Sequence, residues 1–245
     1  NCTRTGTEMK ITALEYERLD LDLKQPYQIA YETVTKSHNI ILKVITDQGL
    51  TGFGCAAPDR EVTGESPEDV IAQVQDPIRS LLEGGAAFRH SYYHHELKKH
   101  DQVGPSARAM TDMALFDLLS RKAGLPLYQM LGGFRSRIPT SITIGILPLE
   151  ETLEQAGRFL REGFRILKLK GGLDPVTDIE KVKKLREAFG SGFDLRFDAN
   201  QGYSPAQAIY FMKQTRSSGI EILEQPTHTK DPKGLREVSR NVSVP

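Results

Sequence analysis

Polar residues recur at nearly constant spacing in the C-terminal half of the chain, each beside a short apolar run. Thr143 and Lys170 are 27 residues apart, Lys170 and Asp198 are 28 apart, and Asp198 and Glu224 are 26 apart. Each interval has room for one strand and one helix. Strands are expected at residues 141–146, 165–169, 193–197 and 220–223, and helices at 149–161, 174–189, 205–216 and 231–240. The repeat predicts a parallel sheet with polar residues at the carboxyl ends of its strands.

This pattern predicts a β/α barrel of the TIM type, which builds its active site at that end of the strands. A complete barrel needs about 250 residues, whereas residues 140–245 have room for about four βα units. Four twisted parallel strands would leave an apolar edge exposed. We therefore expect residues 132–245 to form the first half of a barrel, and the sequence to be truncated within it.

A different pattern precedes the barrel. Three strands of an antiparallel meander are expected at residues 11–23, 39–46 and 50–57, and helices at 66–82, 88–99 and 106–122. A mobile loop is expected at residues 26–36, and residues 1–8 are expected to be a leader without fixed structure. Strands followed by helices predict an α+β domain over residues 9–131.

Composition excludes several classes of protein. The 245 residues contain 32 Lys plus Arg and 32 Asp plus Glu, so the formal net charge is zero. The chain therefore lacks the basic surface of a nucleic-acid-binding or polybasic membrane-surface protein. Its apolar runs are shorter than the roughly 20 residues of a membrane span. Two cysteines, Cys2 and Cys55, argue against a disulfide framework and favour a reducing, cytoplasmic setting.

Two lysines lie in the second predicted strand of the barrel. Lys168 and Lys170 are two residues apart, so on a strand their side chains share a face. If Leu167 and Leu169 pack against helices, both ammonium groups face the barrel interior. Burial and like-charge repulsion would then lower the pKa of each lysine, and such a lysine is a competent general base. The alternative is that both lysines face water at a solvated edge.

The next two predicted strands end in acids, Asp198 and Glu224. Carboxylates at the tips of adjacent strands can share a hard cation such as Mg²⁺. The alternative is that each acid caps the helix that follows it. Both acids lie well before those helices, and Ser204 is a better cap for the first of them. The histidines within residues 90–100 are expected to form a solvated helix face, because no acid or cysteine partner completes a metal site.

Taken together, these stretches resemble the enolase superfamily in its muconate-lactonising branch. The matching stretches are LKLK at residues 167–170, RFDANQGY at 196–203, ILEQP at 222–226, and the helix and linker at 109–133. The resemblance covers essentially residues 9–245. It implies that the α+β domain is a capping domain over the barrel. Within the branch, TSITIGI at residues 140–146 is similar to the first barrel strand of dipeptide epimerases.

The resemblance implies a cofactor and roles for four residues. Asp198 and Glu224 would be the first two Mg²⁺ ligands. Lys170 would be the acid/base that moves the proton α to a substrate carboxylate, and Lys168 would tune it and contact that carboxylate. Mg²⁺ beside the carboxylate would stabilise the enediolate formed on deprotonation. The implied reaction is epimerisation of a dipeptide similar to Ala-Glu by an isomerase.

The resemblance also implies substrate contacts. Thr143 would hydrogen-bond the dipeptide, although an ordinary strand threonine is the alternative, and Tyr27 belongs to a loop that would cover the site. The third metal ligand, an opposing lysine and the aspartates that hold the substrate ammonium are expected beyond Pro245. A cycloisomerase, an N-acylamino acid racemase, an o-succinylbenzoate synthase and an inactive fragment remain alternatives. The expected partner is a small carboxylate, with no nucleic acid or membrane, and a homo-oligomer is left open.

Overall fold

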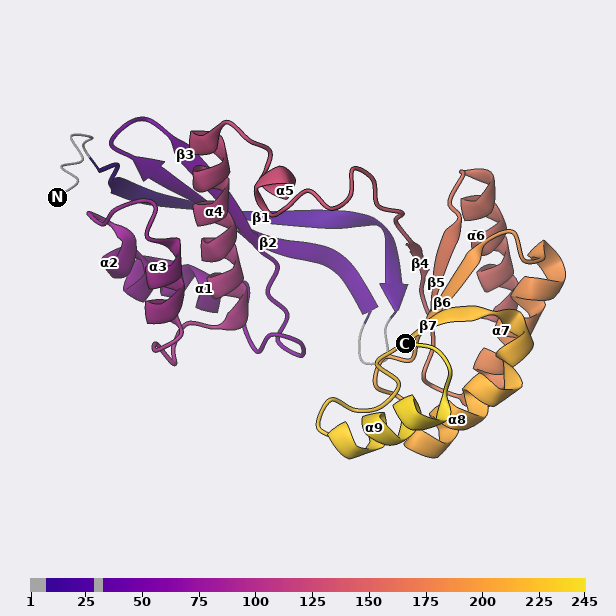
Figure 1. The fold of residues 1–245 in the computed structure, drawn as a ribbon. Coiled ribbons are helices and arrows are strands. Elements are labelled where there is room, and N and C mark those ends of the chain that lie inside the picture. Colours follow the sequence, from indigo (N-terminus) through magenta and orange to yellow (C-terminus); the bar gives the residue numbers. More distant parts are fainter. Residues whose placement is uncertain (1–7, 29–32) are drawn as a thin grey trace. The chain divides into compact units, whose positions relative to one another are not determined.

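The computed structural model describes residues 8–28 and 33–245, which divide into two units (Figure 1). Of the described residues, the first unit contains 8–23 and 36–136, and the second contains 24–28, 33–35 and 137–245. Residues 1–7, which include most of the expected leader, lie outside the described residues.

The first unit contains most of a three-stranded sheet in the order β1-β2-β3, and the last residues of β1 and the first residues of β2 are assigned to the second unit. Its strands are β1 (Ile11–Gln28), β2 (Thr33–Thr46) and β3 (Thr51–Ala56). As predicted, β2 and β3 are antiparallel, paired from Ile40 with Ala56 to Ile45 with Thr51. The loop expected at residues 26–36 is wrong in part, because β1 continues through Gln28 and β2 begins at Thr33. Hydrogen bonding between neighbouring strands can extend a ribbon past the core, where no apolar alternation marks it in the sequence.

The helix expected at residues 66–82 begins as predicted but is interrupted. Ser66 caps α1 (Pro67–Gln73), and its hydroxyl accepts the backbone N–H of Asp69. A π-helical turn (Val74–Ile78) and α2 (Arg79–Leu82) follow. The interruption occurs at Pro77, which has no N–H to donate and drives the preceding residue, Asp76, into an extended conformation (φ −162°, ψ 133°).

The remaining helices of the first unit are α3 (His90–Leu97), α4 (Pro105–Ala123) and the short α5 (Leu127–Met130), which the sequence did not predict. Helix α4 packs directly on β3 because two strand glycines leave room for its backbone. A Cβ at Gly52 would lie 2.3 Å from the Ala114 carbonyl oxygen, and one at Gly54 would lie 1.9 Å from that of Met110. Such close approach of two backbones is a position that requires glycine.

The second unit confirms the predicted βα repeat. Four parallel strands follow the order β4-β5-β6-β7: β4 (Ile142–Ile144), β5 (Ile166–Lys170), β6 (Asp194–Asp198) and β7 (Ile220–Glu224). Each is followed by a helix: α6 (Leu149–Arg161), α7 (Pro175–Phe189), α8 (Pro205–Gln214) and α9 (Pro232–Asn241). A 3₁₀ turn (Arg216–Ser218) precedes β7. The fold is therefore an α+β domain followed by four βα units of a barrel.

Figure 1 shows α6–α9 along one side of the β4–β7 sheet. The apolar side chains of the strands form the core on that side: Leu167, Leu169, Leu195 and Phe197 are fully buried, together with Phe211 of α8. The polar side chains that alternate with them therefore face the opposite side of the sheet. In the part of the chain that the structure describes, no helix has the length and apolar character needed to cross a membrane.

Candidate active site

The strand register brings the predicted site residues to one end of the sheet. Lys170 is the β5 partner of Asp198 on β6, and Asp198 is in turn the partner of Glu224 on β7. Thr143 on β4 lies beside Lys168 on β5. With the leucines of β5 buried against helices, Lys168 and Lys170 project to the other face, 20% and 17% exposed. The lysines therefore do not lie on an open solvated edge.

The charged groups form one connected network. The Lys168 ammonium lies 3.0 Å from Oδ2 of Asp198 and 2.5 Å from Oε2 of Glu224. The Lys170 ammonium lies 3.7 Å from the same Asp198 oxygen. Asp198 is buried, whereas half of the Glu224 side chain is exposed. Asp198 therefore compensates both lysines, and Glu224 compensates Lys168 from the solvent side.

The expectation that burial lowers the pKa of each lysine is wrong for Lys168. Burial alone lowers the pKa of Lys168, but hydrogen bonds to Glu224 and Asp198 outweigh it and raise the pKa above its usual value. The expectation counted the neighbouring cation and the loss of water, and it omitted the two carboxylates that contact this ammonium. Lys168 is therefore held as a cation beside Lys170.

The carboxylates of Asp198 and Glu224 are suited in type and position to bind Mg²⁺. Oxygens of Asp198 and Glu224 converge on one cation, the Lys168 ammonium, and carboxylate oxygens are the ligands that Mg²⁺ prefers. Helix capping does not explain these acids, because Ser204 caps α8 and Asp231 caps α9. Within residues 8–28 and 33–245, no group of three or more His, Cys, Asp or Glu could hold a metal ion. Asp198 and Glu224 are therefore two carboxylates whose oxygens lie close enough together to contact a single cation.

Asn200 is a site residue that the sequence analysis missed. Its Oδ1 accepts a hydrogen bond from the Lys170 ammonium at 3.0 Å, and its Nδ2 donates to the carbonyl oxygens of Asp198 and Gly171. Its backbone is left-handed (φ 47°), as is that of Gln201 (φ 66°). Non-glycine residues in this conformation are uncommon and concentrate at functional sites. The only signal in the sequence was a polar residue two positions after Asp198.

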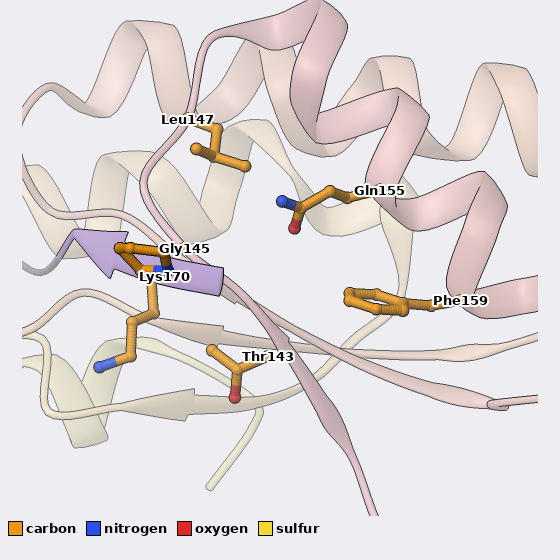
Figure 2. Close-up of a pocket in the computed structure, with 7 residues that line it drawn as sticks. Thr143, Gly145, Leu147, Gln155, Phe159 and Lys170 are labelled. Carbon is orange, nitrogen blue, oxygen red and sulfur yellow. The ribbon is translucent and has the colours of Figure 1, made fainter. Parts of the chain in front are cut away.

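A cavity of about 290 Å³ joins Thr143 to Lys170 (Figure 2). Its lining is completed by Pro26, Gly145, Leu147, Gln155 and Phe159. Figure 2 shows Gln155 and Phe159 reaching from α6 toward the cavity, across from Thr143 of β4. The sequence analysis missed these two residues, because helical periodicity does not distinguish a cavity wall from the core. Tyr27 belongs to β1, but its side chain lies outside what the structure describes.

Two histidines of α3, His90 and His94, have an acid partner that the sequence analysis did not identify. Nε2 of His90 lies 2.6 Å from Oδ1 of Asp112 on α4, and Nδ1 of His94 lies 3.8 Å from the same oxygen. The His90 ring also packs on Phe116, with 4.1 Å between ring centroids. The sequence did not reveal this partner because Asp112 is distant in sequence and becomes a neighbour only when α3 packs on α4. These contacts tie the two helices together.

Comparisons with known proteins identify the family of both units. Residues 13–132 match the N-terminal domain of the mandelate racemase/muconate lactonizing enzyme family, and residues 151–245 match the enolase C-terminal domain-like family. The L-Ala-D/L-Glu epimerase of Bacillus subtilis is 34% identical over 97% of this chain and 66% of its own length. The L-Lys-D/L-Arg epimerase of Desulforapulum autotrophicum is 38% identical over 94% of this chain and 67% of its own length.

A solved structure shows the same likeness. The dipeptide epimerase of Enterococcus faecalis, crystallised with Mg and the dipeptide L-Leu-L-Tyr, superposes with a TM-score of 0.92 at 32% identity. The match covers 96% of this chain and 66% of that one. The chain thus spans about two thirds of the length of these relatives. By its two matching domains and its fold, the chain belongs to the mandelate racemase/muconate lactonizing branch of the enolase superfamily.

Proposed function

We propose that this protein is a Mg²⁺-dependent isomerase that removes the proton α to a carboxylate and so epimerises a dipeptide. The observation that carries the proposal is the network of Lys168, Lys170, Asp198 and Glu224 beside a cavity that Lys170 and Thr143 line. The epimerases among its relatives support the choice of a dipeptide.

The proposed roles follow from charge and position. Lys168, held as a cation, binds the substrate carboxylate. Lys170, as the free amine, accepts the α-proton on Nζ, and the electron pair of the broken C–H bond delocalises into the carboxylate. Asn200 orients Lys170 through the hydrogen bond to Oδ1. A Mg²⁺ held by Asp198 and Glu224 would supply positive charge beside that carboxylate. A second acid of the full-length protein, on the opposite face of the carbon, then donates a proton there, and this completes the epimerisation.

The cavity supports a small substrate with both polar and apolar parts. Its volume of about 290 Å³ is at the lower end of ligand sites, which begin near 300 Å³. Leu147 and Phe159 give it apolar walls, and Thr143 and Gln155 give it hydrogen-bonding groups. We assign the hydroxyl of Thr143 to a hydrogen bond with the dipeptide. Tyr27 is proposed as a side chain that covers the bound substrate.

Proton exchange tests the proposal directly. The full-length protein is incubated with Mg²⁺ in deuterated water with acidic, basic and apolar dipeptides, and proton NMR follows the α-proton signals. We expect one class of dipeptide to lose an α-proton signal and gain signals of the epimer, and we expect chelation of Mg²⁺ to stop both. Exchange of an N-succinyl amino acid but of no dipeptide would replace the proposal by N-acylamino acid racemisation. Absence of exchange with all of these substrates would refute it.

A further inference from the structure

A buried carboxylate lies behind the candidate site and is not part of the charged network. Asp178, on α7, is 2% exposed. Its Oδ2 accepts two hydrogen bonds, one from the backbone N–H of Gly172 at 2.8 Å and one from the hydroxyl of Tyr203 at 2.7 Å. Gly172 belongs to the loop after β5, and Tyr203 belongs to the loop after β6. One oxygen atom therefore joins the two loops.

These loops approach each other backbone to backbone. The N–H of Gly171 donates to the Asp198 carbonyl oxygen at 2.9 Å. A Cβ at Gly172 would lie 1.9 Å from the Ala199 carbonyl oxygen, and a Cβ at Gly202 would lie 2.1 Å from that of Gly172. The two loops are therefore held together by close backbone packing and by hydrogen bonds, among them the two that Asp178 accepts.

The joined loops carry the groups of the candidate site. Lys170 immediately precedes Gly171 in the sequence. Asn200, which accepts a hydrogen bond from the Lys170 ammonium, lies between Asp198 and Tyr203. We propose that Asp178 is a positioning residue: by fastening the loop after β5 to the loop after β6, it sets where the Lys170 ammonium lies. This inference rests on the proposed function for its catalytic consequence.

The surroundings of Asp178 suit this role. Burial raises the pKa of the Asp178 carboxyl, and the bonds from Gly172 and Tyr203 and the charge of Lys181, 4.0 Å from Oδ1, act in the opposite direction. Burial also raises the pKa of Tyr203, which keeps its hydroxyl protonated as a donor. Lys181 is itself buried and gives the carboxylate a compensating charge. The Asp178 carboxylate is therefore held in place as the hydrogen-bond acceptor of both loops.

The test compares two substitutions at one position. Asp178→Ala removes both hydrogen bonds, whereas Asp178→Asn keeps an oxygen that can accept both. We expect kcat for α-proton exchange to fall about 100-fold in Asp178→Ala with KM changed by less than about threefold, because a misplacement near 1 Å has a cost of that size. Asp178→Asn should restore most of the rate. Glu187→Ala removes an exposed carboxylate from the far end of the same helix, outside both loops, and should leave kcat unchanged.

Crystal structures of the full-length variants give a readout that does not depend on activity. In Asp178→Ala we expect the 3.0 Å contact between Lys170 and Asn200 to be lost. An intact contact with unchanged kcat would overturn the proposal, as would equal losses of kcat in Asp178→Ala and Asp178→Asn. If the wild type shows no exchange, the proposed function fails and the contact alone decides the positioning role. If Asp178→Ala does not fold, Tyr203→Phe, which removes one of the two bonds, is expected to show a smaller shift of the same kind.

Discussion

The ammonium of Lys170 donates a hydrogen bond to the side-chain oxygen of Asn200, 3.0 Å away. Its other near polar partner is Oδ2 of Asp198, at 3.7 Å. The two acceptors belong to the end of β6 and the loop that follows it, while Lys170 is the last residue of β5. The proposed acid/base is thus oriented from the neighbouring strand and not by its own.

Lys170→Ala should abolish exchange of the substrate α-proton with deuterated water. A positioned acid/base contributes about 10²- to 10⁴-fold to such a step, so we expect a loss of at least that size. Binding of Mg²⁺ should survive, because Lys170 is not a proposed ligand. Exchange is followed by NMR and metal binding by calorimetry. Lys184→Ala, which removes an exposed lysine paired with Glu187, is the control and should exchange normally. Full exchange in Lys170→Ala would assign the base to another residue.

Asp198→Asn and Glu224→Gln should each weaken Mg²⁺ binding and abolish activity with little change in fold. Each substitution keeps the side-chain shape but removes one negative charge, and Mg²⁺ is held in proteins through few carboxylates. Asp198 is the more buried of the two and contacts both lysines, so loss of its charge also leaves Lys168 with only Glu224 as a compensating carboxylate. Calorimetric titration of the full-length protein with Mg²⁺ measures the effect.

The control for the metal prediction lies on the same strand. Glu221 of β7, the strand that also carries Glu224, pairs with Arg196 at 3.0 Å. Among the described residues, the ion pairs of Lys168 and Lys170 involve Asp198 and Glu224 and not Glu221. Glu221→Gln should therefore leave the affinity for Mg²⁺ unchanged. If Asp198→Asn and Glu224→Gln bind Mg²⁺ as tightly as this control, the two acids are not metal ligands and the proposed function loses its cofactor site.

The sequence predicted the strand ends of the second unit well because two regular patterns mark them: the spacing of the βα units and the alternation of apolar and polar residues along each strand. The 26- to 28-residue spacing located each βα unit, and the alternation of Leu167 and Leu169 with Lys168 and Lys170 predicted which face each side chain takes. Both signals are local properties of a strand between helices. The positions of the lysines and acids followed from them without knowledge of tertiary contacts.

What the sequence did not predict depends on contacts between distant segments. The role of Asn200 requires a left-handed backbone and the proximity of the β5 loop, neither of which a residue type reveals. The raised pKa of Lys168 depends on carboxylates 30 and 56 residues away in sequence. Asp112 meets His90 only because α3 packs on α4. In each case the sequence lacked the identity of the contacting residue, which the tendency of a residue type to form a helix or strand does not reveal.

Gly54→Ala should destabilise the first unit. A Cβ at this position would lie 1.9 Å from the Met110 carbonyl oxygen, so α4 must move away from β3. Overpacking of this kind costs about 1–3 kcal/mol, and contact with rigid backbone favours the upper part of that range. Urea unfolding followed by circular dichroism measures it. Gly192→Ala is the control, since a Cβ there has open space. Equal stabilities of the two variants would contradict the close approach of α4 to β3.

Asp174 should make stability depend on pH in the acid range. Its carboxylate caps α7 and accepts the hydroxyl and backbone N–H of Thr177 at 2.6 and 2.8 Å. These bonds lower the pKa of Asp174 in the folded state. The unfolded chain therefore binds the proton more tightly, so the stabilisation is fully present above the unfolded pKa, about 3.9, and is lost as the pH falls through the folded pKa.

Asp174→Asn removes this titration but keeps an acceptor for the cap. The difference in free energy of unfolding between wild type and Asp174→Asn should stay constant from about pH 5 to 7 and change in favour of Asp174→Asn below about pH 4. Urea unfolding at a series of pH values measures it. Glu180→Gln, an exposed change on the same helix beyond its first turn, should not reproduce that change. A difference between wild type and Asp174→Asn that does not vary with pH would show that the Asp174 carboxylate does not gain these hydrogen bonds on folding.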